Sequence, residues 1–139
     1  MGGSKSFGVN QLVGRVVSGS GRGAQYLREE GYKKRFQEKL GFTPYPGTLN
    51  IKLTKKAVEN LRKTAEEVGL RINGFFDGGK MFGGVLCLPA RVGDVSCAII
   101  FPEKSTHLDV VELAAPINLR QHHRLGDGDK VEIKLGVRR

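Results

Sequence analysis

The second half of the chain is a series of short apolar segments with almost no helical pattern between them. After residue 70 come RINGFF (71–76), KMFGGVLCLPARV (80–92), VSCAIIFP (95–102), VVELAAP (110–116) and KVEIKLGV (130–137). Apolar runs of this length between turn residues are typical of β-strands. A doubly wound parallel sheet would need a helix between most strands, and this half offers none. The pattern therefore predicts a small closed β-barrel, in which strand pairing removes exposed edges.

The first half adds two strands and two helices to this expectation. Residues 10–19 (NQLVGRVVSG) predict a first strand, and residues 48–53 alternate polar and apolar side chains as a half-buried strand does. Amphipathic helices are expected at 26–40 and 54–69, the second with Thr54 as its N-cap and Gly69 at its end. INLRQHH (117–123) predicts one short helical turn. We expect residues 1–10 to be a flexible leader and 11–139 to form a single, mainly β domain.

Charge and cysteine content narrow the class of protein. The net charge is +9 and the isoelectric point is about 9.8, so the partner is expected to be anionic, a nucleotide or a nucleic acid. No apolar run approaches the ~20 residues of a membrane helix, and the amino terminus has no apolar signal core. Cys87 and Cys97 lie in apolar segments and are predicted to be buried thiols. We therefore expect a cytoplasmic protein without membrane contact.

A glycine-rich segment, SGSGRG (18–23), lies between the first strand and the first predicted helix. Glycine allows backbone N–H groups to approach a phosphate closely, and Arg22 adds a positive charge there. The glycines do not form a Walker loop, because Gly-Lys-Ser/Thr is missing, and the dinucleotide fingerprint does not fit either. A simple turn is the alternative interpretation.

Two further groups of polar residues are candidates for binding a metal ion. Thr48 and Asn50 lie on one face of the predicted strand and offer the oxygen ligands that Mg²⁺ prefers, although an ordinary polar strand face is the alternative. The adjacent His122 and His123 are expected to point to different sides of any regular element, and no third ligand is spaced for zinc. We expect these two and His107 to be non-catalytic.

Several segments occur in the order found in one enzyme family. They are GRVVSGSGRGAQYL, LGFTPYPGTLNIKL, FGGVLCLPARV, FPEKSTHLDVVELAAPINLR and LGDGDKVEI, which together span residues 14 to 137. In these segments the chain resembles the archaeal CTP-dependent riboflavin kinases. The resemblance implies a six-stranded cradle-loop barrel that transfers the γ-phosphate of CTP to the 5′-hydroxyl of riboflavin, giving FMN and CDP. Many relatives carry a DNA-binding winged helix in front, for which we expect no room here.

The resemblance also implies a set of site residues. It assigns the nucleotide to Val17, Ser18, Gly19, Ser20, Gly21, Arg22 and Gly23, together with Ile117, Asn118, Leu119 and Arg120. Thr48 and Asn50 would hold Mg²⁺, which gives the polar strand face a role. Ser105 or Thr106 and Glu112 would contact the flavin, with Glu112 acting either as a base or as an anchor. The glycine loop departs from the family, because relatives often carry a bulky apolar residue and an acid where this chain has Ser20 and Arg22.

Two other functions remain compatible with the sequence. Small basic barrels with a GDGD-type turn (126–129 here) also occur in DNA-binding regulators, so a nucleic-acid-binding barrel is the rival class. An inactive or engineered relative of the kinase is the other. We expect a monomer that binds riboflavin and CTP rather than nucleic acid.

Overall fold

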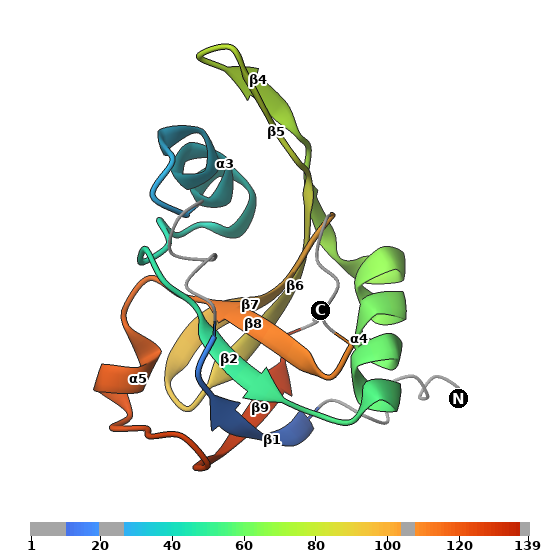
Figure 1. The fold of residues 1–139 in the computed structure, drawn as a ribbon, viewed down its shortest axis with the longest axis vertical. Helices are drawn as coiled ribbons and strands as arrows, with labels where there is room; N and C mark the ends of the chain where they lie inside the picture. Colours follow the sequence, from blue (N-terminus) through green and yellow to red (C-terminus); the bar gives the residue numbers. More distant parts are fainter. Residues whose placement is uncertain (1–10, 20–26, 104–107, 137–139) are drawn as a thin grey trace.

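The structure is a computed structural model that describes residues 11–19, 27–103 and 108–136. Figure 1 shows a barrel with one helix packed along its side, a second helix near its upper end and a hairpin projecting away from it. The strands are β1 (Gln11–Val17), β2 (Leu49–Lys52), β3 (Leu70–Ile72), β4 (Phe75–Asp77), β5 (Lys80–Phe82), β6 (Val85–Val92), β7 (Val95–Pro102), β8 (Val110–Ala114) and β9 (Lys130–Leu135). The helices are α3 (Glu30–Leu40), α4 (Lys55–Val68) and α5 (Leu119–His122).

Six strands close into the predicted barrel. Their order is β6-β7-β8-β2-β1-β9, and β9 pairs back onto β6 through Ala90 with Leu135 and Arg91 with Lys134. All of these pairings are antiparallel, and β3 adds one further strand to the edge of β6. The prediction of a closed six-stranded barrel is therefore confirmed.

Strand β7 is buried on both of its faces, which explains its unbroken apolar sequence. Alternate residues such as Cys97 and Ile99 belong to one apolar cluster, which includes the residues of α4 that face the barrel. Ala98 and Ile100 belong to a second cluster, which packs against Tyr32 and Phe36 of α3. The described residues thus form two apolar cores separated by one wall of the barrel.

Both cysteines are buried and free, as predicted, and each lies in a different core. Cys97 belongs to the cluster inside the barrel, whereas Cys87 belongs to the cluster beneath α3. Burial raises the pKa of each thiol to about 12, because a thiolate would lose its hydration there.

The segment between α4 and β6 differs from the prediction. RINGFF was expected to be one strand, but it is divided between β3 and β4, and KMFGGVLCLPARV is divided between β5 and β6. Glycines at 74, 83 and 84 interrupt the run, and glycine inside a strand favours such a bend. As a result β4 and β5 form a separate hairpin that leaves the barrel (Figure 1).

The helices follow the sequence signals more closely. Helix α4 begins after Thr54, whose hydroxyl accepts a hydrogen bond from the N–H of Ala57 at 3.1 Å, and it ends at Gly69 as expected. Helix α3 begins at Glu30, later than predicted, because Glu29 is still extended. The expected helical turn at 117–123 is α5. Among the described residues, no helix is long and apolar enough to cross a membrane.

The Thr54 cap generates a testable stability difference. Replacing Thr54 with Ala removes the acceptor for the N–H of Ala57 and should lower the free energy of unfolding by about 1 kcal/mol, measured by urea denaturation. Thr64→Ala is the matched control, because the same side chain is lost from the middle of the same helix, where Ala is the better helix former. Equal losses in the two variants would contradict the assigned cap.

Candidate functional site

The candidate site begins with a row of paired residues on the outer face of the barrel. Asn50 of β2 lies opposite Val17 of β1 on one side and Glu112 of β8 on the other. The neighbours of Asn50 along the strand, Leu49 and Ile51, are buried in the barrel core. Because side chains alternate between the faces of a strand, Asn50 and Glu112 project outward together.

A hydrogen bond joins this row to the residue that precedes β2. The hydroxyl of Thr48 donates to Oε1 of Glu112 at 2.8 Å, in a partly buried position. Because its proton points at the carboxylate, the Thr48 oxygen keeps its lone pairs for another partner. Thr48, Asn50 and Glu112 therefore form one oxygen-rich cluster, contributed by β2, the residue before it and the neighbouring strand β8.

The end of β1 crosses closely over this cluster. A Cβ atom at Gly19 would lie 2.6 Å from Cγ of Asn50, so any side chain there would displace the amide. Glycine at 19 lets the backbone pass next to Asn50 and leaves the amide in place.

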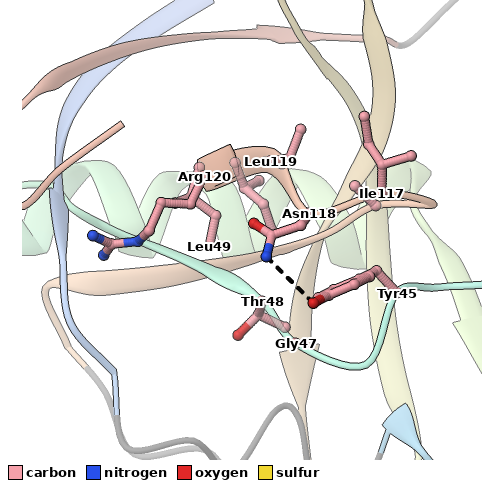
Figure 2. A pocket seen from close by; sticks show the side chains of 10 residues that line it. Tyr45, Gly47, Thr48, Leu49, Ile117, Asn118, Leu119 and Arg120 are labelled. Carbon is pink, nitrogen blue, oxygen red and sulfur yellow. Dashed lines mark hydrogen bonds between the residues drawn. The ribbon is translucent and has the colours of Figure 1, made fainter. Parts of the chain in front are cut away.

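A pocket opens beside Thr48 (Figure 2). It is lined by Tyr45, Gly47, Thr48, Leu49, Leu113, Ala115, Ile117, Asn118, Leu119 and Arg120. Its volume of about 160 Å³ is below the ~300 Å³ at which drug-sized ligand pockets begin, so it fits a single ring better than a whole nucleotide. The amide of Asn118 donates to the hydroxyl of Tyr45 at 3.3 Å across the pocket wall.

Asp127 connects two of the predicted nucleotide segments. Arg120 donates to its Oδ1 at 2.9 Å, and the hydroxyl of Ser18 donates to its Oδ2 at 2.8 Å. The hydrogen bond from Arg120, followed by that from Ser18, lowers the pKa of Asp127 below its usual value. One carboxylate therefore holds the start of the glycine segment next to the segment that follows β8.

The structure brings together many of the residues that the sequence singled out. Thr48 lies in the same pocket as Ile117, Asn118, Leu119 and Arg120. It also contacts Glu112, which is the strand partner of Asn50. Val17, Ser18 and Gly19 approach the same region through Asn50 and Asp127. The remaining predicted residues lie outside the described ranges: Ser20, Gly21, Arg22, Gly23, Ser105, Thr106 and His107.

Sequence reasoning missed Tyr45 and Asp127. Tyr45 lies between two prolines, and its N–H donates to the carbonyl of Ala115 at 2.7 Å, which ties the PYPG segment to the end of β8. The available signal was its place in PYPGTLN, the same short segment that contains Thr48 and Asn50. Asp127 lies in the GDGD turn, which predicted a turn and nothing more.

The expectation that the paired histidines diverge and lack a third ligand was wrong, whereas their assignment as non-catalytic residues stays a prediction. The rings of His122 and His123 meet edge to face with their centroids 4.7 Å apart. They also have a third partner, since Asp94 lies 3.2 Å from Nε2 of His122 and 4.0 Å from Nε2 of His123. Because α5 ends at His122, the two residues do not continue one regular helix, and their side chains converge on the turn between β6 and β7.

Comparison of the sequence with known proteins identifies the family of this chain. The family model CTP-dep_RFKase, described as "Domain of unknown function DUF120", matches residues 16–135. The chain belongs to the CTP-dependent riboflavin kinase family. It is 47% identical over 126 residues to the riboflavin kinase of Pyrobaculum islandicum. The aligned residues cover 90% of this chain and 60% of that protein. It is 40% identical over 134 residues to the riboflavin kinase of Methanosarcina barkeri, covering 95% of this chain and 59% of that protein.

Coverage of the family relatives is partial. The riboflavin kinase of Ignicoccus hospitalis is 43% identical over 123 residues, which is 88% of this chain and 69% of that protein. The chain spans about 60% of the length of the riboflavin kinases of four Pyrobaculum species.

The hydrogen bond between Thr48 and Glu112 predicts a measurable coupling. In a double-mutant cycle of Thr48→Val and Glu112→Ala, we expect the two changes to be non-additive by about 1 kcal/mol in the free energy of unfolding. The control cycle uses Arg91 and Ser96, a cross-strand pair that is exposed and 3.3 Å apart, and should give almost no coupling. Additive effects of Thr48→Val and Glu112→Ala would contradict the bond.

Proposed function

We propose that this chain is a CTP-dependent riboflavin kinase. In the proposed reaction the 5′-hydroxyl oxygen of riboflavin attacks the γ-phosphorus of CTP. The bond from that phosphorus to the oxygen bridging the β-phosphate breaks, the hydroxyl proton is released, and the products are FMN and CDP. The observation that supports this most is the position of Thr48, which borders the pocket and also contacts Glu112.

The pocket is the proposed site for the cytosine ring of CTP. It has room for a single ring and contains the segment from Ile117 to Arg120, which the family resemblance assigns to the nucleotide. Helix α5 begins directly after Asn118, whose side chain caps it by accepting from the N–H of Gln121 at 3.1 Å. Capping holds this backbone in a fixed position, which favours readout of one base over another.

The phosphates are proposed to extend from the pocket toward Thr48 and the glycine segment. Arg120 would supply positive charge, and Asp127 would keep its guanidinium oriented while anchoring Ser18. Phosphoryl transfer asks a protein mainly to align the reactants and to offset charge, so a positioned arginine and a close-lying backbone suit the task.

The oxygen cluster fits the Mg²⁺ that the family implies. Thr48 and Asn50 provide a hydroxyl and an amide oxygen, which are ligands suited to a hard cation, and the absence of a side chain at Gly19 keeps the amide of Asn50 undisplaced. Bound there, the ion would neutralise phosphate charge during transfer. For the metal site, Glu112 would orient the Thr48 hydroxyl by accepting its hydrogen bond at Oε1.

Glu112 is also the proposed contact for riboflavin. Its Oε1 accepts the Thr48 hydrogen bond, so we assign Oε2 to the riboflavin hydroxyl that will be phosphorylated. We favour anchoring over proton abstraction, because a loose phosphoryl-transfer transition state requires little help from a base.

The test of the proposal is product formation from riboflavin. Incubation of the chain with riboflavin, Mg²⁺ and CTP should produce FMN, detected by chromatography, and CTP should be at least about tenfold more effective than ATP at matched concentrations. Equal rates with both nucleotides would overturn the base-recognition pocket. If FMN forms neither with CTP nor with ATP, the kinase assignment is overturned.

The metal assignment predicts a specific loss. Thr48→Ala combined with Asn50→Ala should reduce turnover by on the order of 100-fold and abolish its dependence on Mg²⁺ concentration, because both proposed ligands are removed. The matched control is Lys52→Ala on the same strand, where an exposed pair with Asp109 is lost from a residue that does not line the pocket. A double variant that keeps the wild-type Mg²⁺ response would show that this strand face is ordinary surface.

A further inference from the structure

A second group of potential metal ligands lies away from the oxygen cluster described above. It consists of Asp94, in the turn between β6 and β7, together with His122 and His123 at the end of α5. One ligand atom from each of these residues lies within 4.8 Å of the others. Two elements that are distant in the sequence therefore direct two imidazoles and a carboxylate to one place.

The spacing is close to that of a metal site. In tetrahedral zinc sites with bonds of about 2.0–2.1 Å, neighbouring ligand atoms are separated by roughly 3.3 Å. Asp94 Oδ1 and His122 Nε2 are already 3.2 Å apart, and a ring nitrogen of His123 lies within 4.8 Å of ligand atoms of the other two residues. The Asp94 side chain is 75% exposed on a turn and that of His122 is 40% exposed, so both have room to move.

A hydrogen bond to the backbone fixes which ring nitrogen of His123 carries the proton. Its Nε2 lies 3.0 Å from the carbonyl oxygen of Val92, and a carbonyl only accepts, so Nε2 carries the proton and Nδ1 carries the lone pair. A ring N–H donated to a backbone carbonyl is the usual support of a metal-binding histidine. Gly93, with φ of +59°, packs against the ring, and a Cβ atom there would lie 2.7 Å from Cε1 of His123.

We propose that Asp94, His122 and His123 bind one divalent transition-metal ion of the Zn²⁺ class. Imidazole nitrogens with a carboxylate oxygen suit Zn²⁺, Co²⁺ or Ni²⁺, whereas Mg²⁺ prefers oxygen ligands alone. The ion replaces the proton that His122 shares with Asp94 and joins the end of α5 to the β6–β7 turn. Because α5 starts at the pocket wall, the ion fixes that wall from the opposite end of the helix. The proposal does not depend on the kinase assignment.

The experiment is a calorimetric titration in which Zn²⁺ alone is added to the metal-free, untagged chain. We compare the wild type with Asp94→Asn, His122→Gln and the double variant. The wild type should bind one equivalent more than the double variant, and each single change should weaken that binding at least about tenfold. The controls are Asp77→Asn, at the end of β4 next to another hairpin turn, and Gln121→Ala on α5, both of which should bind Zn²⁺ as the wild type does.

Thermal unfolding provides a second measurement. Zn²⁺ should raise the midpoint of unfolding for the wild type and both controls, and leave it unchanged in the double variant. The replaced side chains are exposed, so without metal the double variant should unfold as the wild type does. Equal Zn²⁺ stoichiometry in the wild type and the double variant, or displacement of the extra Zn²⁺ by millimolar Mg²⁺, would overturn the proposal.

Discussion

The pairing of β9 with β6 is the constraint on which the rest of the structure depends. Without it, β9 and the part of β6 that β3 does not pair with would be open edges of a long sheet, and the interior cluster would lack one wall. Closure also determines the surroundings of the candidate site, because it curves β1, β2 and β8 into a continuous outer wall. Asn50 and Glu112 are adjacent on that wall only because β2 and β8 pair in this register. A shift of β2 by one residue would turn Asn50 into the core, whereas Glu112 would keep its orientation because β8 is also paired with β7.

The site is assembled from loops that the barrel holds at one place. Thr48 precedes β2, Asn118 and Arg120 follow β8, and Asp127 precedes β9. The links between them are short polar contacts, such as those of Asp127 with Ser18 and Arg120. The strands supply position and two of the proposed functional side chains, Asn50 and Glu112, and the segments between the strands supply the others.

Features set by local pattern were predictable from the sequence, whereas features set by contacts between distant segments were not. The apolar runs predicted the strands, and Thr54 predicted the start of α4. The place of Thr48 and Asn50 on one polar face was also visible in the residue alternation. The bond between Ser18 and Asp127 joins residues 109 positions apart, and no local pattern encodes it. The convergence of the two histidines on Asp94 depends in the same way on where α5 ends relative to a distant turn.

The placement of the two buried thiols has a consequence for studying the motions of this protein. Cys87 belongs to the core beneath α3 and Cys97 to the core inside the barrel, although the two lie on neighbouring strands. With pKa values of about 12, neither thiol reacts appreciably until local opening admits water and restores its ordinary acidity. Alkylation rates at the two positions therefore report separately on the opening of each core. The native chain contains two chemical probes, one on each side of a single barrel wall.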